Sequence, residues 1–412
     1  MADKKIYILD VTNRDGVQTS RLGLAKLEKT IMNLLLNELG AAQAEFGFPF
    51  TRHETNYLNA NLELAEKGVL QPMVLSGWCT ARLKEVETAF TLVPGLRHMN
   101  ISVSTSPQMI KGKFSGNKGL EDIIDMLRAA VKKAYALGAT FVAVNAEDAS
   151  RTPQEDLAAF IEAGREAGAR RFRYCDTLGC DDPRTIYERI RGLAERTGLD
   201  VELHCHNDLG LAVANSVAGA QGAVDGGVNA YVNTTVNGMG ERAGNADMLS
   251  VLLAFRYGRG LAGTYALDER IDLTKAWGLA KYASYAFSVP LPVNQPGVGG
   301  NAFAHESGIH ADGALKDRRN YELYHYEDLG RGEPEIVDTG RQITVGEYSG
   351  IKGFRNVYDK LEIEFRDDAE AATVLELARY ANVHTQKPLT THELKFIALY
   401  PEIARKIMTV TP

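Results

Sequence analysis

Short apolar runs alternate with longer stretches of helical periodicity along the first two-thirds of the chain. Each run has the length and composition of a strand, and a segment whose apolar positions fall on one helix face follows it. The predicted strands are Ile6–Thr12, Ala42–Phe46, Met73–Gly77, His98–Val103, Thr140–Asn145, Arg171–Cys175, Val201–His206 and Asn229–Asn233. The predicted helices between them include Gly23–Asn37, Asp122–Tyr135, Glu155–Glu166, Thr185–Arg196 and Ala212–Ala223.

Strands that alternate with helices indicate βαβ units and a parallel sheet. Eight such units in roughly 255 residues match the usual size of a closed (β/α)8 TIM barrel. An open, doubly wound sheet is the alternative, but it would be expected to carry a Gly-rich dinucleotide-binding turn after its first strand. The sequence shows no such turn after Ile6–Thr12. The pattern therefore favours an α/β fold of the TIM-barrel type.

The pattern changes after Arg259. Tyr282–Gly300 is rich in Pro, Gly and Ser and predicts a loop, Asn301–Leu315 predicts a helix with two histidines, and Val357–Thr409 returns to helical periodicity. We therefore expect a barrel domain over residues 1–260, a connecting subdomain over 261–350 and a small helical subdomain over 351–412.

The composition is that of a globular protein with no preference for nucleic acid or membranes. Hydrophobic residues make up 45% of the 412 residues and charged residues 24%, and the net charge of −7 is spread over interspersed acidic and basic positions. No basic cluster suggests nucleic acid, and the apolar run Ile6–Leu9 is too short for a signal peptide or a membrane span. Four cysteines in so long a chain do not form a disulfide framework, so a cytoplasmic, reducing setting is expected.

Enzymes with this fold carry their chemistry at the carboxyl ends of the strands, and a polar cluster follows the first predicted strand. Residues 10–18 read DVTNRDGVQ, in which Gly16 permits a tight turn. Arg14 and Asp15 can then present a guanidinium and a carboxylate to one pocket. A surface turn with a weak ion pair is the alternative interpretation.

A second cluster, HCHND at residues 204–208, follows the seventh strand. Residues i and i+2 of a strand face the same side, so His204 and His206 can hold one metal ion while Cys205 packs on the other side. Two core histidines with satisfied hydrogen bonds are the alternative, but the barrel position and the carboxylate after the first strand favour a metal. Such a set leaves positions open for substrate oxygens, and Mg²⁺, Mn²⁺ and Co²⁺ all tolerate it.

Further polar residues follow other predicted strands. Asn245, in NGMGERAGN after the eighth strand, can reach a metal held by the first and seventh strands. Glu147 follows the fifth strand, and Thr177, after the sixth, can donate a hydrogen bond to a substrate carboxylate. Outside the barrel, His310 in HESGIHADG would suit proton abstraction from a methyl group next to a thioester, or else it packs or caps a helix.

These clusters, in this order, resemble the DRE-TIM metallolyase superfamily and in particular its Claisen-condensing branch. That branch contains isopropylmalate, citramalate, homocitrate and Re-citrate synthases. The resemblance runs from Ile6 to about Leu329, and the opening DVTNRDGVQTSRLGLAKLEKT is most similar to that of Re-citrate synthases. It implies a divalent-metal-dependent acyltransferase that condenses acetyl-CoA with a 2-oxo acid, here oxaloacetate, to give citrate.

The resemblance also implies roles for individual residues. The implied metal ligands are Asp15, His204, His206 and, as a further or outer ligand, Asn245. Arg14 would stabilise the alkoxide that develops on the ketone oxygen, and the implied substrate-positioning residues are Gln18, Glu147 and Thr177. His310 with Tyr321 would enolise acetyl-CoA. In the family this segment reaches into a neighbouring subunit's barrel, which implies an intertwined homodimer.

The choice of oxaloacetate depends on polar residues expected near the ends of the third and fourth strands. They are Ser76, Gly77, Cys79, Ser104, Thr105 and Ser106, with Arg82 and Lys111 nearby in sequence. Hydroxyls and cations suit a second carboxylate better than a branched alkyl group. Fungal-type homocitrate synthases carry an Arg where this chain has Ile110, which favours oxaloacetate over 2-oxoglutarate.

Several alternatives stay open. Asn13 and Val17 depart from the usual Thr-Leu-Arg-Asp-Gly-Glu-Gln motif, which leaves the chemistry intact but puts the choice of acceptor in doubt, so homocitrate, isopropylmalate and citramalate synthases remain alternatives. A 3-hydroxy-3-methylglutaryl-CoA lyase would share the barrel clusters but not the segment with His310 and Tyr321. A non-catalytic metal-binding relative is the remaining class. We expect no leucine-sensing domain of the kind found in long isopropylmalate synthases, since the sequence after Leu329 is short.

Overall fold

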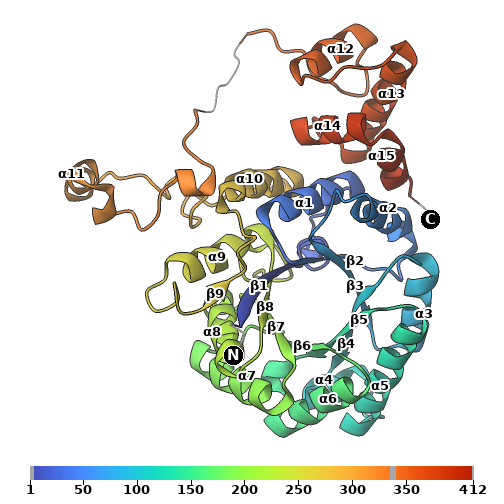
Figure 1. The fold of residues 1–412 in the computed structure, drawn as a ribbon, viewed down its shortest axis with the longest axis vertical. Coiled ribbons are helices and arrows are strands. Elements are labelled where there is room, and N and C mark those ends of the chain that lie inside the picture. The colour runs from blue at the N-terminus through green and yellow to red at the C-terminus, as the bar shows by residue number, and fades with distance from the viewer. Residues whose placement is uncertain (1–3, 335–339, 411–412) are drawn as a thin grey trace.

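The computed structural model describes residues 4–334 and 340–410 and shows a closed barrel of eight parallel strands surrounded by helices (Figure 1). The barrel strands are β1 (Lys5–Asp10), β2 (Gln43–Gly47), β3 (Val74–Thr80), β4 (His98–Ser104), β5 (Phe141–Glu147), β6 (Arg171–Asp176), β7 (Asp200–Cys205) and β8 (Ala230–Thr234). Closure occurs at β1, where Leu9 lies opposite Gln43 of β2 and Asn233 of β8. The predicted TIM barrel is confirmed, and each predicted strand agrees with an observed one to within a few residues.

Helices cover the outside of the barrel. They are α1 (Lys26–Leu39), α2 (Thr55–Glu66), α3 (Leu83–Leu92), α5 (Leu120–Ala136), α6 (Gln154–Glu166), α7 (Pro183–Thr197), α8 (Ala212–Asp225) and α9 (Met248–Tyr257). The short helix α4 (Pro107–Lys113) instead follows β4 at the carboxyl end of the barrel, where Lys113 pairs with Glu147. A two-residue strand, β9 (Ala266–Leu267), runs parallel to β1 at its edge. The helices leave the carboxyl ends of the strands free to carry the polar clusters, as the fold requires of an active site.

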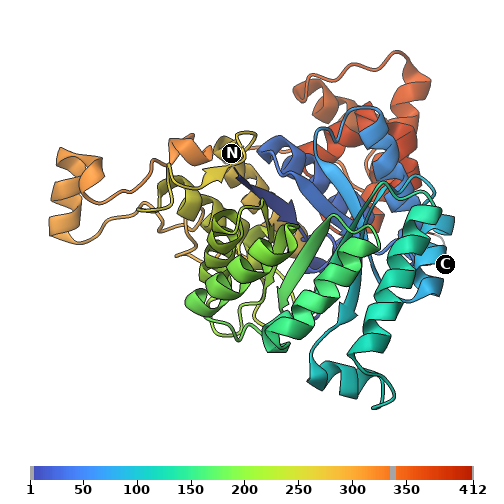
Figure 2. The same cartoon turned by 60° about the horizontal axis from the view of Figure 1, so that its bottom comes forward.

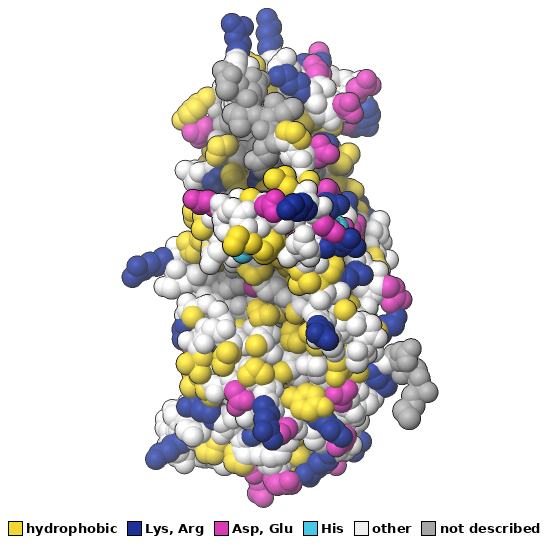
Figure 3. Space-filling model, turned by 90° about the vertical axis from the view of Figure 1, so that its left-hand side faces the viewer, with side chains coloured by type: hydrophobic (Ala, Val, Ile, Leu, Met, Phe, Trp, Pro, Cys, Tyr) yellow, Lys and Arg dark blue, Asp and Glu magenta, His cyan; other side chains and the backbone are white. Residues whose placement is uncertain are grey.

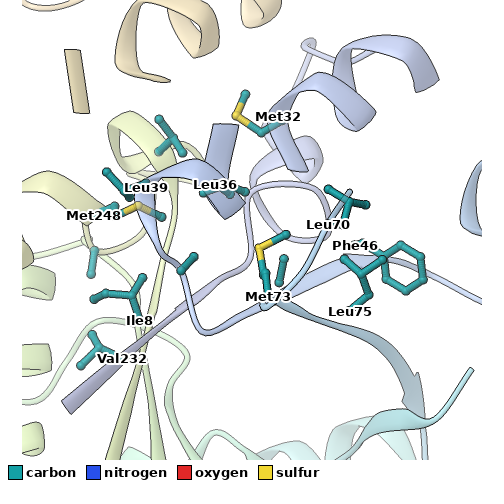
Figure 4. Packing of buried hydrophobic residues seen from close by; sticks show 14 of the residues in the cluster. Ile8, Met32, Leu36, Leu39, Phe46, Leu70, Met73, Leu75, Val232 and Met248 are labelled. Carbon is teal, nitrogen blue, oxygen red and sulfur yellow. The ribbon is translucent and has the colours of Figure 1, made fainter. Parts of the chain in front are cut away.

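The two faces of the barrel wall differ in polarity. Successive residues of a strand point to opposite sides, and Ile8 and Val232 face outward to the same side as Leu39 and Met248 of the surrounding helices (Figure 4). The inward positions are instead rich in polar and charged residues. The fully buried inward side chains include Glu45, Arg173 and Glu202. The apolar core therefore lies between strands and helices, while the interior of the barrel is held by ion pairs.

Two sequence-based predictions outside the barrel need correction. The predicted loop Tyr282–Gly300 begins too early, because α10 (Ala276–Phe287) continues through its first six residues and buries Tyr282 and Phe287. The tertiary contact with α1 overrides the local Gly, Pro and Ser content. The predicted helix Asn301–Leu315 is shorter than expected, since α11 spans only Gly308–Lys316 and Ser307 before it has an extended conformation.

The last helices form a layer on one side of the barrel. They are α12 (Ile351–Lys360), α13 (Asp368–Thr385), α14 (Thr391–Leu399) and α15 (Pro401–Met408). Lys406 Nζ lies 2.6 Å from a carboxylate oxygen of Glu63 in α2, and Lys387 Nζ lies 2.8 Å from one of Glu28 in α1. We retain as a proposal the division into residues 1–260, 261–350 and 351–412.

The α11 segment, which we define as residues 305–323 around that helix, projects from the rest of the molecule in two views (Figures 1 and 2). It carries exposed apolar side chains, with Ile309 75%, Leu315 89% and Leu323 72% exposed. Figure 3 looks onto the side from which this segment projects and shows hydrophobic side chains gathered over the middle of that face. Within residues 4–334 and 340–410, no helix is long and apolar enough to span a membrane.

Candidate metal centre and active site

Three potential metal ligands meet at the carboxyl ends of β1 and β7. Asp15 lies in the turn after β1, His204 lies on β7, and His206 follows that strand directly. Their ligand atoms all lie within 4.8 Å of one another and all three residues are buried. The two imidazole rings have centroids 5.0 Å apart and stand nearly perpendicular, at 87°. The predicted i, i+2 arrangement thus turns both rings toward one carboxylate, while Cys205 packs in the apolar core.

The electrostatics of this cluster suit a cation. Burial alone would raise the pKa of the Asp15 carboxyl, but Arg14 and the two imidazoles more than offset it and hold that pKa well below its usual range. Burial lowers the pKa of His204 well below its usual value and also lowers that of His206. At neutral pH the cluster therefore offers an ionised carboxylate and two neutral imidazoles, which are the protonation states that bind metals.

Asn245 completes the cluster from the loop after β8. Its side-chain amide donates a hydrogen bond to Asp15, and its backbone forms an isolated bridge with His206. Gly244 precedes it with φ of 92°, and a Cβ there would lie 2.1 Å from the carbonyl oxygen of Gly238. This close approach, which only glycine permits, sets the position of Asn245.

Two buried atoms of the cluster lack hydrogen-bond partners within the described part of the chain. They are Asn245 Oδ1 and His206 Nδ1. Leaving buried polar atoms unpaired costs on the order of 1–3 kcal/mol each, so such atoms call for an explanation. An oxygen and a nitrogen lone pair beside an ionised carboxylate fit a divalent cation, and the observed residues therefore suit the predicted metal.

Arg14 is fixed next to the cluster by several contacts. Its Nη1 donates to Asp15 Oδ1 over 2.6 Å and its Nε donates to Glu45 Oε2 over 2.8 Å. Its guanidinium also lies over the Trp78 ring, 5.6 Å from the centroid. Arg14 is only 5% exposed, so its orientation is set by the barrel interior rather than by solvent. The alternative of a loose surface turn for residues 14 and 15 does not fit this geometry.

Glu147 and Thr177 take positions on the other side of the barrel mouth. Lys113 Nζ lies 2.6 Å from each Glu147 carboxylate oxygen, and the Ser104 hydroxyl donates to the same group. Thr177 Oγ1 accepts the backbone N–H of Asp148 over 2.9 Å, which leaves its hydroxyl hydrogen available for a substrate. Gln18 ends the short 3-10 turn Gly16–Gln18 and is exposed.

His310 and Tyr321 are brought together, but away from the barrel cluster. Their rings stack at a centroid distance of 4.2 Å and an interplanar angle of 22°. Both side chains are exposed on the projecting α11 segment, and His305 of the same segment lies 3.4 Å from Glu322. The structure thus confirms neither residue as part of the Asp15 site within one chain.

Of the residues expected near the ends of the third and fourth strands, those of the fourth lie there, whereas those of the third need correction. Strand β3 continues to Thr80, so Ser76 lies inside it, hydrogen-bonded to Gln43, and Cys79 packs outward in the apolar core. The hydroxyls of Thr105 and Ser106 are engaged by Thr152 and Asp148. The Arg82 side chain is 71% exposed and paired with Glu85, and Lys111 is exposed. The cation that contacts the inner wall is instead Lys113.

Charged residues inside the barrel were not among the predicted functional residues. Glu45, Arg173 and Glu202 each occupy an inward position on a strand and connect Arg14 to the barrel interior. A signal existed, because each of these residues has apolar neighbours on both sides in an otherwise buried strand. Alternation of polar and apolar residues in a fully buried strand indicates a polar interior.

Comparison with known proteins agrees with this geometry. The HMGL-like family model matches residues 5–282, and the model described as homocitrate synthase post-HMGL domain-like matches residues 298–385. The citrate (Re)-synthase of Dehalococcoides mccartyi is 58% identical over 99% of both chains. The 2-isopropylmalate synthase 2 of Caldanaerobacter subterraneus subsp. tengcongensis is 35% identical over 98% of this chain and 97% of its own.

The fold is also similar to that of a solved structure. The HMG-CoA lyase of Bacillus subtilis superposes with a TM-score of 0.56 at 20% identity, covering 70% of this chain and 96% of the lyase. That likeness concerns the barrel fold alone, whereas the sequence matches extend through the region after it. The chain therefore belongs to the HMGL-like family, in the Claisen-condensing branch of the DRE-TIM metallolyase superfamily.

Proposed function

We propose that this protein condenses acetyl-CoA with oxaloacetate and water to give citrate and CoA. The observation that carries the proposal is the 58% identity to a citrate (Re)-synthase over 99% of both chains, together with the Asp15, His204 and His206 cluster at the barrel mouth. The protein would be an acyltransferase that converts the acyl group into an alkyl group on transfer. Homocitrate, isopropylmalate and citramalate synthesis remain the alternatives within the same branch.

The metal-binding residues in this proposal are Asp15, His204 and His206, with Asn245 as a further ligand. When bound there, Mn²⁺, Mg²⁺ or Co²⁺ would supply Lewis acidity toward the carboxylate and ketone oxygens of the 2-oxo acid. The unpartnered Asn245 Oδ1 supports its assignment as a ligand atom.

The remaining barrel residues bind and polarise the acceptor. Arg14 stands beside Asp15 with its guanidinium held by Glu45, so it can stabilise negative charge that develops on the ketone oxygen. Thr177 has a free hydroxyl hydrogen for the substrate carboxylate, and Gln18 borders the same mouth. Glu147 lies across the barrel and forms an ion pair with Lys113. The ammonium group of Lys113 can bind a second carboxylate on the acceptor.

Proton removal from acetyl-CoA is assigned to His310 with Tyr321. The two stacked side chains lie on a projecting segment whose exposed apolar residues would be costly to leave in water. We propose that this segment docks on the barrel of a second copy, so that a homodimer assembles two active sites. Docking would bring an imidazole to the methyl group of acetyl-CoA and would exclude water from the enolate.

A cytoplasmic location belongs to the same proposal. The four cysteines are free thiols, and three of them, Cys79, Cys175 and Cys205, are buried. Free thiols fit a reducing compartment.

One assay tests the function and its alternatives together. Release of free CoA is measured with acetyl-CoA and, in turn, oxaloacetate, 2-oxoglutarate, pyruvate and 2-oxoisovalerate, with and without a chelator. We expect chelator-sensitive turnover with the highest kcat/KM for oxaloacetate. A tenfold preference for 2-oxoglutarate would make the protein a homocitrate synthase. Cleavage of 3-hydroxy-3-methylglutaryl-CoA without any condensation would identify a lyase, and no turnover with any of these substrates would indicate a non-catalytic relative.

A further inference from the structure

A continuous chain of ion pairs runs through the interior of the barrel and ends at Arg14. Glu45 uses its two carboxylate oxygens separately: Oε2 accepts from Arg14 Nε over 2.8 Å, and Oε1 accepts from Arg173 Nη2 over 2.6 Å. Arg173 Nε in turn donates to Glu202 Oε2 over 2.7 Å, and Arg171 Nη1 donates to Glu202 Oε1 over 3.0 Å. Positive and negative charges therefore alternate from the floor of the barrel to the metal cluster.

Strand register explains the order of these residues. Arg173 of β6 lies opposite Glu202 of β7, and two residues further along Cys175 lies opposite His204. Arg173 thus stands one layer below the histidine ligand. Its side chain, like those of Glu45 and Glu202, has no solvent exposure.

Burial restricts each charged group in this series of ion pairs to one position. Moving an ion out of water costs several kcal/mol even in real proteins, and the cost is recovered only when the hydrogen-bond geometry is good. A guanidinium is a rigid planar fork, so Arg173 can face two carboxylates at fixed positions. The result is that Glu45 can neither rotate nor attract Arg14 more closely without losing its bond to Arg173.

We propose that Arg173 is a positioning residue for the condensation: through Glu45, it fixes the guanidinium of Arg14 where the ketone oxygen of the acceptor becomes negatively charged. The inference rests on the proposed function, because Arg14 acts on the ketone in that reaction. Without Arg173, Glu45 keeps a single cationic partner and draws Arg14 toward itself, away from Asp15 and the substrate. Preorganised charge of this kind matters most in the transition state, so its loss appears in kcat rather than in KM.

A purely structural role would have a different signature. Replacing a buried ion pair with apolar residues is often neutral or stabilising, so stability alone gives little reason to place charges here. A structural pair would change the free energy of unfolding but not the turnover of the molecules that remain folded. Turnover per folded, metal-loaded molecule therefore separates the two roles.

The test compares Arg173→Met with Arg171→Met in the full-length protein. Arg171 faces the same interior and shares the partner Glu202, but its other hydrogen bond goes to Gln43 rather than to Glu45, so it serves as the matched control. Metal content and folding are measured for each variant, and CoA release is followed at saturating acetyl-CoA. We expect Arg173→Met to lower kcat by about tenfold or more with the acceptor KM within about threefold of the parent. Arg171→Met should keep kcat within about threefold.

Two further variants keep the test decisive even if Arg173→Met does not fold. Arg173→Lys keeps a cation on Glu45 and should retain an intermediate kcat, and Arg173→Gln replaces Arg173→Met if the latter does not fold, with the same expected loss. The proposal is wrong if the folded, metal-loaded Arg173→Met or Arg173→Gln protein keeps its kcat, or if Arg171→Met loses as much. If the parent prefers another 2-oxo acid, the acceptor assignment fails but the same comparison applies with that acid, because all of them present the same ketone. A parent without any condensation activity would refute the proposed function itself.

Discussion

Lys113 and Glu147 form an ion pair on the wall of the barrel that faces the metal cluster. Lys113 ends α4 after strand β4, Glu147 ends strand β5, and Nζ lies 2.6 Å from both carboxylate oxygens. In the order of strands around the barrel, β5 lies opposite β1, from which Asp15 extends. We expect an acceptor held at Asp15 by its 2-oxo acid end to extend across the barrel mouth toward Lys113.

Lys113→Met is expected to change acceptor choice. Oxaloacetate has a second carboxylate and pyruvate has none, so kcat/KM should fall by about tenfold or more for oxaloacetate and much less for pyruvate, as expected for loss of a hydrogen bond to a charged group. Steady-state kinetics with both acceptors measure this. Lys111→Met, an exposed neighbour on the same helix, is the control. An equal loss for both acceptors would mean that Lys113 only supports Glu147.

His204→Ala is expected to abolish turnover and to lower the metal content of the purified protein, because an imidazole of the buried cluster is removed. Metal analysis after dialysis and circular dichroism check the two parts of this expectation. Cys205→Ser changes the adjacent residue on the outward side and should retain the metal. Full activity of His204→Ala after exhaustive chelation would contradict the metal assignment.

Mixing two inactive variants tests whether the His310 segment acts on a second copy. A dimer of one His204→Ala chain and one His310→Ala chain holds one site with both defects and one intact site. Random assembly of equal amounts gives about half mixed dimers, so co-expression should restore about a quarter of the parental activity. If the segment acts within its own chain, every site carries a defect and the mixture stays inactive. Exchange of the acetyl-CoA methyl protons with solvent, measured on His310→Ala alone, should be lost.

His98 makes the fold sensitive to acid. Burial lowers the pKa of His98 to about 4, and its ring stacks on Phe141 at 5.2 Å. Because the unfolded chain binds the proton near pH 6.5 and the folded chain only near pH 4, stability should fall as the pH drops through that window, by up to about 3 kcal/mol. Urea unfolding at pH 7, 5.5 and 4.5 measures the loss. His98→Gln should show a smaller loss over the same range, and an identical pH profile would exclude His98 as its cause.

The barrel and the cluster of Asp15, His204 and His206 could be predicted because local patterns determine both. Strand periodicity locates β1 to β8, and the i, i+2 spacing alone places His204, on β7, and His206, directly after it, on the same side of the chain. The position of Asp15 follows from the rule that barrel enzymes use the carboxyl ends of their strands. Each of these inferences needs only neighbours in sequence and the parallel topology.

Other features depend on contacts between distant segments. Arg173 and Glu45 are 128 residues apart in sequence, and their pairing follows from barrel closure and register. Lys113 was overlooked in favour of Lys111 and Arg82, because the direction of a side chain on α4 depends on where that short helix ends. The predicted start of a loop at Tyr282 was wrong for a related reason, because packing against α1 extends α10 to Phe287.

Docking of the projecting α11 segment on a second copy would make the activity depend on protein concentration. If each barrel receives its base from another copy, a diluted solution contains intact barrels that bind metal and acceptor yet turn over nothing. Specific activity would then fall at protein concentrations below the dissociation constant of the dimer. The unfolding transition of the barrel would change little over the same concentrations. Acceptor and acetyl-CoA would also slow that loss, because each bound at such a shared site holds the two copies together.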